Sequence, residues 1–167
     1  MKQEIRTTAR AIVKELKAAG KTVATAESCT GGGIAAALTS ISGSSAVVRG
    51  GIVSYATEVK HDLLHVKADT LRRYDVVSQQ VVTEMAQGAL KALKADYAVA
   101  TSGISGPTGG TPENPVGTVW MAIATRVGKV ATRCVRGDDL GRSRNTQRAI
   151  LEALRMLLEE VTSWPQA

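Results

Sequence analysis

Residues able to do acyl-transfer chemistry gather between Gly43 and Lys60, in the stretch GSSAVVRGGIVSYATEVK. The stretch holds two adjacent serines, a tyrosine and a lysine. A serine hydroxyl is a weak nucleophile at its own pKa and needs a base to remove its proton. A lysine in the first turn of a helix lies where the helix dipole disfavours positive charge, so its amine can act as a base nearer neutral pH. The stretch therefore indicates a serine nucleophile, with Lys60 as its general base and Tyr55 as a proton relay.

The same residues also have an ordinary structural interpretation. In it, Ser44 or Ser45 only caps a turn. Tyr55 is then a half-buried strand residue, and Lys60 is solvated. Serine, tyrosine and lysine are common residues and short motifs often match by chance, so spacing alone leaves both interpretations open.

The elements that flank this stretch would hold its side chains in place. A Gly-Gly pair releases the backbone, and residues 51–55 then predict a short strand rich in β-branched side chains. Thr57 is the predicted N-cap of a helix that runs to Leu64. Lys60 would therefore lie in the first turn of that helix.

A first glycine-rich loop, ESCTGGG, joins a predicted strand over residues 22–26 to a predicted helix over residues 34–40. Such a turn makes a good anion site, because backbone N–H groups and the helix dipole point outward. The loop lacks both the ending of a P-loop and the GxGxxG pattern. Its glycines would equally serve a tight turn, so both interpretations stay open. The candidate substrate-binding residues here are Ser28, Thr30, Gly31 and Gly32.

A second glycine-rich loop, SGISGPTGG, follows a predicted strand over residues 97–101 and continues to Pro115. Loops of this length tend to be functional or disordered. In open α/β sheets, ligands bind beyond the carboxyl ends of the strands. We therefore expect both loops and Tyr55 at one edge of the sheet. The candidate binding residues in this loop are Ser102, Gly103 and Gly106.

Strands and helices alternate along most of the chain. This alternation predicts an α/β fold, a three-layer α/β/α sandwich with a mixed, mostly five-stranded sheet. Val127-Gly128 predicts a hairpin between residues 116–126 and 129–136, and hence antiparallel pairing. Residues 1–167 are expected to form a single domain that ends in a short tail over residues 164–167. The other expected helices cover residues 3–19, 68–73, 78–94 and 142–161.

The composition is that of an ordinary soluble globule, with 44% hydrophobic and 22% charged residues. No apolar run predicts a membrane span or a signal peptide, so the expected location is the cytoplasm. Cys29 and Cys134 give no disulfide framework and have no metal-ligand spacing. His61 and His65 are interpreted as ordinary surface residues. No metal site is expected.

The net charge of +6 favours anionic partners, although it also serves solubility. Aromatic residues make up only 3% of the chain, whereas single-strand-binding surfaces stack bases on aromatic rings. The charge therefore favours a small phosphorylated ligand over nucleic acid.

Four motifs occur in order along the chain: ATAESCTGG, GSSAVVRGGIVSYATEVK, SGISGPTGG with PVGTVW, and GDDLGRSR. In this order they closely resemble the CinA C-terminal domain family, the nicotinamide-nucleotide amidohydrolases. The resemblance covers residues 13–154. It implies the stand-alone form of the enzyme, without the extra N-terminal domain of longer CinA proteins.

The resemblance implies hydrolysis of the carboxamide of nicotinamide mononucleotide (NMN) to nicotinate mononucleotide and ammonia, without a cofactor. It places the catalytic serine, tyrosine and lysine on Ser45, Tyr55 and Lys60. Arg142 is then expected to help hold the substrate phosphate. The resemblance also implies a homodimer or a higher homo-oligomer.

Two alternatives stay open at this point. Cys29 precedes a predicted helix N-terminus, where the pKa of a thiol falls, and so is a second candidate nucleophile. The other alternative is a non-catalytic module that binds a phosphorylated nucleotide and takes part in competence or the DNA-damage response. Release of ammonia from NMN separates an enzyme from such a module.

Overall fold

The computed structural model describes residues 1–163 of the chain. Five strands form one sheet in the order β2-β1-β3-β4-β5. β1 pairs in parallel with β2 and β3, whereas β4 runs antiparallel to β3 and β5. The predicted mixed five-stranded sheet is confirmed. The strands are β1 (Val23–Glu27), β2 (Val48–Val53), β3 (Tyr97–Gly103), β4 (Val119–Thr125) and β5 (Val130–Val135).

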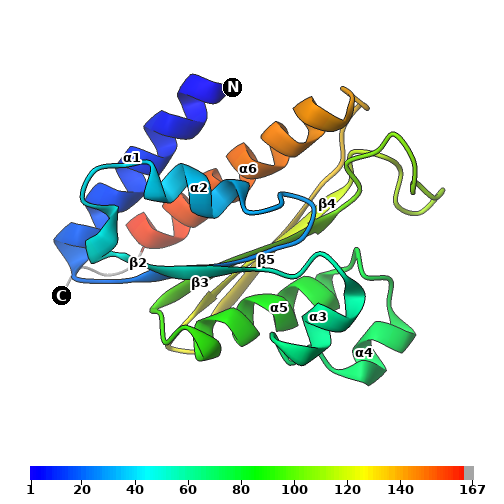
Figure 1. The fold of residues 1–167 in the computed structure, drawn as a ribbon, viewed down its shortest axis with the longest axis horizontal. Coiled ribbons are helices and arrows are strands. Elements are labelled where there is room, and N and C mark those ends of the chain that lie inside the picture. The colour runs from blue at the N-terminus through cyan, green and yellow to red at the C-terminus, as the bar shows by residue number, and fades with distance from the viewer. Residues whose placement is uncertain (164–167) are drawn as a thin grey trace.

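Helices cover both faces of the sheet, as the predicted three-layer sandwich requires (Figure 1). One face carries α1 (Lys2–Ala19), α2 (Gly33–Thr39) and α6 (Arg142–Ser163). The other face carries α3 (Thr57–Asp62), α4 (Ala68–Arg73) and α5 (Gln79–Ala92). None of the helices in residues 1–163 has the length and apolarity needed to cross a membrane. The predicted tail over residues 164–167 lies outside the described residues.

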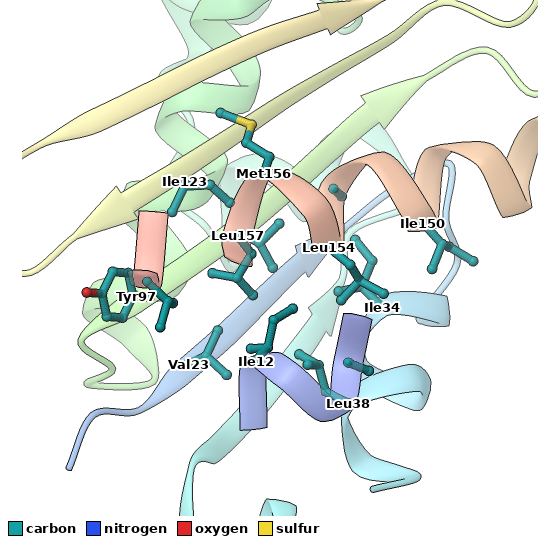
Figure 2. Close-up of a cluster of buried hydrophobic side chains, with 14 of the residues drawn as sticks. Ile12, Val23, Ile34, Leu38, Tyr97, Ile123, Ile150, Leu154, Met156 and Leu157 are labelled. Atoms are coloured by element: carbon teal, nitrogen blue, oxygen red, sulfur yellow. The ribbon is translucent and has the colours of Figure 1, made fainter. Parts of the chain in front are cut away.

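The two faces of the sheet are packed differently. Large aliphatic side chains from α1, α2 and α6 interlock over one face, among them Ile12, Leu154 and Leu157 (Figure 2). The face below α5 is built largely from alanines of β1, β3 and β4, such as Ala98 and Ala122. Small side chains let a helix approach the sheet closely, so α5 lies tight against the strands.

The same close packing continues from α5 outward to the segment that follows α3. Gly88 of α5 faces the backbone of Leu64, and a Cβ atom at position 88 would lie 1.9 Å from the Leu64 carbonyl oxygen. Leu64 is itself buried, and the N–H of Val66 bonds to the carbonyl of Lys60 at 3.1 Å. The segment after α3 therefore touches α5 at Gly88, and a cavity of about 600 Å³ opens beside this contact, lined by Leu64, His65 and Gly88 among others.

Parallel pairing brings the ends of three strands together. In the register of the sheet, Glu27 of β1 lies opposite Val53 of β2 and Thr101 of β3. The residues that follow these strands therefore emerge at one edge of the sheet, which we call the carboxyl edge. This edge is where ligands bind in open α/β sheets.

The structure differs from the predictions beside Tyr55 in three details. β2 ends at Val53, so Tyr55 lies in the connection to α3 rather than in the strand. The N-cap of α3 is Ala56 instead of Thr57, and no side chain caps this helix. Lys60 lies on α3, but in its last turn instead of the predicted first turn, because the helix ends at Asp62.

Candidate active site

Lys60 is a buried lysine, with 2% of its surface exposed. Its Nζ donates hydrogen bonds to the carbonyl oxygen of Ser54 at 2.6 Å and to the Oγ of Ser28 at 3.1 Å. Among the described residues, no carboxylate forms an ion pair with it. Burial lowers the pKa of Lys60, because a charged ammonium loses its hydration there. The predicted direction of the pKa shift is confirmed, and the main cause is desolvation.

Ser28 is the hydroxyl that the fold brings to this amine. It follows β1 directly, and its backbone N–H bonds to the carbonyl of Thr101 in β3 at 3.1 Å. Its own carbonyl accepts the N–H of Gly31 at 3.0 Å, which closes a tight turn. Ser28 was expected to bind substrate, and the structure places its Oγ 3.1 Å from the Nζ of Lys60.

Ser45, the expected nucleophile, lies at the opposite edge of the sheet. It is an exposed residue of the 3-10 helix η1 (Ser44–Ala46), which precedes the first residue of β2. Tyr55 and Lys60 follow the last residue of β2, and six residues of strand span roughly 17 Å. The structure therefore does not bring Ser45 to Lys60 within the chain, because an extended strand separates them.

Glu27 determines the shape of the turn that carries Ser28. Its carboxylate is fully buried and accepts the N–H groups of Gly32, Ile34 and Ala35 at 2.8 to 3.1 Å. It also accepts the hydroxyl of Thr30 at 2.6 Å. A carboxylate at a helix N-terminus satisfies the free N–H groups and the dipole.

Of the two interpretations left open for the first glycine-rich loop, this carboxylate favours the tight turn over an open anion site. Glu27 fills the position that a bound anion would take, and the N–H of Gly31 is used within the turn. Thr30 is buried, and its hydroxyl lies 2.8 Å from the hydroxyl of Thr101. Thr30, Gly31 and Gly32 thus stabilise the turn through these hydrogen bonds. An acidic residue just before a glycine-rich helix start was the sequence signal for this arrangement.

A cavity of about 310 Å³ opens at the carboxyl edge above Ser28 and Lys60. Both ends of the predicted site line it: the turn after β1 and the second glycine-rich loop. Its volume is at the lower end of the range for small-molecule sites, which suits a single nucleotide. Lining residues that the sequence predicted are Ser28, Tyr55, Lys60, Ser102, Gly103, Gly106 and Arg142. Asp75, Val76 and Val77 line it without having been predicted.

Tyr55 and Arg142 meet across the mouth of this cavity. The Nη2 of Arg142 donates to the Tyr55 hydroxyl at 3.0 Å, and its Nη1 donates to the carbonyl of Gly106 at 2.7 Å. Tyr55 is 61% exposed. The phenol therefore bonds to Arg142, whereas Lys60 reaches Ser28 directly.

Cys29 lines the cavity next to Ser28 but has a different chemistry. Burial raises the pKa of its thiol to about 12. The thiolate is the nucleophilic form of cysteine, and it is scarce near neutral pH at such a pKa. The geometry therefore favours Ser28 over Cys29 as the nucleophile.

Acidic residues, cysteines and histidines do not come together as metal ligands within residues 1–163. His61 has a structural contact, because its Nδ1 lies 2.8 Å from the carbonyl oxygen of Val66.

An α/β fold with a hydroxyl against a desolvated lysine at the carboxyl edge is equipped for acyl transfer. The chain belongs to the CinA C-terminal domain family, whose model matches residues 5–161. The family resemblance drawn from the four motifs is confirmed.

Relatives and solved structures agree with this membership. The chain is 55% identical over 125 residues to nicotinamide-nucleotide amidohydrolase PncC of Escherichia coli strain K12, covering 74% of this chain and 76% of that protein. It is 45% identical over 150 residues to a CinA-like protein of Thermotoga neapolitana, of which it spans 36%. The structure of the competence/damage inducible protein CihA from Agrobacterium tumefaciens superposes with a TM-score of 0.92 at 44% identity, covering 96% of each chain. The relatives whose names state an activity are hydrolases, in agreement with the predicted enzyme class.

Proposed function

We propose that this protein hydrolyses the carboxamide of NMN to nicotinate mononucleotide and ammonia, with Ser28 as nucleophile and Lys60 as base. The observation that carries the proposal is the 3.1 Å contact between Lys60 Nζ and Ser28 Oγ on the wall of the cavity. The relatives named nicotinamide-nucleotide amidohydrolase support the choice of substrate.

The buried amine supplies the base in this mechanism. A neutral amine has two N–H donors and one lone pair. The carbonyl of Ser54 accepts one N–H at 2.6 Å, which fixes the nitrogen and leaves it facing Ser28. Lys60 takes the proton of Ser28 Oγ as this oxygen attacks the carboxamide carbon.

The proton then returns to the leaving group. Lys60, now protonated, passes it to the amide nitrogen, so that the C–N bond breaks and ammonia leaves from an acyl-enzyme ester on Ser28. A water molecule attacks this ester with Lys60 again as the base, and the proton goes back to Ser28 as the acid is released. Backbone N–H groups near Ser28 stabilise the oxyanion, which is a large contribution in acyl transfer.

Arg142 anchors the 5′-phosphate of the substrate in this proposal. Arg142 lines the cavity, and its guanidinium donates one hydrogen bond to Gly106 and one to Tyr55. A guanidinium has five N–H donors, so further donors stay available for a phosphate. We further infer that the enzyme works in the cytoplasm as a homo-oligomer, with neither a metal nor a cofactor.

Release of ammonia from NMN tests the proposal. Ser28→Ala should lower kcat by about a thousandfold or more, because it removes the nucleophile. Ser45→Ala and Cys29→Ala should each retain activity within about twofold, since they leave the Ser28–Lys60 pair intact. Loss of activity in Ser45→Ala with retention in Ser28→Ala would contradict the assignment. A wild type that binds the nucleotide but releases no ammonia would support the alternative of a non-catalytic binding module.

A further inference from the structure

One acidic residue lines the cavity that holds Ser28 and Lys60. Among the described residues that line the cavity, Asp75 is the only acidic one, and Lys60 and Arg142 are the basic ones. Asp75 is exposed and lies in the connection between α4 and α5. Within residues 1–163 it forms no ion pair. The described lining of the cavity thus includes one acidic residue without an ion-pair partner and two basic residues.

The backbone around Asp75 is held by buried side chains. The Oδ1 of Asp75 accepts the N–H of Val77 at 2.9 Å, which fixes the carboxylate on its own turn. Ser102, 2% exposed, donates to the carbonyl of Val76 at 2.8 Å. Asn114, 8% exposed, donates from Nδ2 to the carbonyl of Val77 at 3.2 Å. The second glycine-rich loop therefore holds the backbone of Val76 and Val77 in place. Asp75 is thus positioned before a ligand binds.

The substrate of the proposed reaction has a matching distribution of charge. Its phosphate is anionic, and its pyridine ring carries a permanent positive charge at the ring nitrogen. With the carboxamide at Ser28 and the phosphate at Arg142, the cationic ring must lie within the cavity, near one or two basic groups. Lys60 becomes positively charged when it takes the proton of Ser28, and this like charge would repel the ring unless a carboxylate offsets it.

We propose that Asp75 recognises the cationic ring of the substrate and so selects pyridinium nucleotides over carboxamides with an uncharged ring. The inference rests on the proposed function and adds a specificity-determining residue to it. Asp75 takes no part in proton transfer.

The experiment compares two ligands that differ in ring charge. Oxidised NMN has a cationic ring, whereas its reduced form has the same carboxamide, ribose and phosphate on an uncharged ring. Dissociation constants are measured by calorimetry in Ser28→Ala protein, which binds without turnover. Adding Asp75→Asn should weaken the oxidised form about fivefold to tenfold, as expected for one partly exposed charge pair, and leave the reduced form within about twofold.

Asn keeps an oxygen that can accept the N–H of Val77, so the turn should stay folded, and thermal denaturation checks this. Asp62→Asn is the matched control, because it changes the net charge equally from an exposed position on α3 outside the cavity. It should change neither dissociation constant.

The other possible results contradict either the inference about Asp75 or the proposed function. Equal weakening of both forms would mean that Asp75 binds the ribose hydroxyls, and no weakening of either would mean that it binds nothing. Both results overturn the inference while ammonia release by the wild type upholds the proposed function. If the wild type releases no ammonia, the proposed function fails and the ratio of affinities still decides on Asp75. A protein that binds neither form refutes both.

Discussion

The two edges of the sheet carry similar turns with opposite outcomes. At the carboxyl edge, Ser28 begins a glycine-rich turn and meets the amine of Lys60. At the amino edge, Ser44 and Ser45 follow Gly43, and a lysine is again close: a Cβ atom on Gly43 would lie 2.9 Å from the Nζ of Lys17. Both edges therefore combine serine, glycine and lysine.

Burial distinguishes the two edges. Lys60 is 2% exposed, whereas Lys17 is an exposed residue of α1. Ser44 donates its hydroxyl to the carbonyl of Thr39 at 3.2 Å, which satisfies the end of α2. An amine becomes a useful base only where water is withdrawn from it. Residue types and spacing therefore indicate candidate pairs of a serine and a lysine, and desolvation of the amine determines which pair can react.

The largest expected effect comes from removing the base. Lys60→Met keeps a long side chain but no amine, and we expect kcat for ammonia release to fall about a thousandfold or more. Lys60→Arg should be nearly as damaging, because a guanidinium does not lose its proton in the working range. Lys17→Met is the matched control at the amino edge and should retain activity within about twofold. Substantial activity in Lys60→Arg would show that position 60 supplies only positive charge.

The pH dependence of the wild type sharpens the same point. In the proposed mechanism Lys60 acts when neutral, and burial lowers its pKa from the ordinary value of 10.5. The value of kcat/KM should therefore rise with pH to a plateau, and the midpoint of the rise should give an apparent pKa below 10.5. A rate that falls across this range would argue that the protonated form is the active one. Rates are best measured against NMN concentrations below KM.

The next effect concerns Glu27, which has no counterpart at the amino edge. Glu27→Ala leaves buried N–H groups at the start of α2 without acceptors, and we expect the free energy of unfolding to fall by about 3 kcal/mol. Denaturant titration measures this loss. Glu58→Ala, at an exposed position on α3, should change stability by less than about 0.5 kcal/mol. Unchanged stability in Glu27→Ala would mean that other groups hold the turn.

Arg142 should have a smaller effect, limited to substrate affinity. We expect Arg142→Ala to raise KM for NMN about tenfold, because one charged phosphate contact is lost. Nicotinamide riboside has no phosphate and should be hydrolysed almost as by the wild type. Equal losses on both substrates would assign Arg142 to the support of Tyr55 and Gly106 instead.

The smallest effect is a gain in stability. Between the folded pKa of Lys60 and its ordinary value of 10.5, the unfolded chain binds more protons, so the stability of the wild type rises with pH across that window. Lys60→Met abolishes this slope. It should raise the free energy of unfolding by about 1 kcal/mol at neutral pH, or roughly 2–4 °C in Tm. Equal stability of both proteins from neutral pH to 10.5 would show that burying the amine costs nothing.

The sequence allowed much of the fold to be predicted, because hydrophobic patterns, turn residues and ordered motifs act locally. It also placed Lys60, Tyr55 and both glycine-rich loops at one edge, since each follows a strand. The sequence did not indicate Ser28 as the proposed nucleophile, because Ser28 reaches Lys60 through the pairing of Glu27 with Val53, which joins segments far apart in the chain. Asp75 was missed because its place at the cavity depends on hydrogen bonds from a distant loop.

The contact between Gly88 and Leu64 suggests a substitution outside the cavity that would act on Lys60. Any side chain at position 88 must push the Leu64 carbonyl away, because a Cβ atom would lie 1.9 Å from it. Leu64 lies two residues beyond the end of α3, the helix that carries Lys60, so we expect a displacement of Leu64 to change the burial of the amine. We therefore expect a larger side chain at position 88 to shift the pH dependence of the proposed reaction through Lys60, from a residue that does not line the cavity.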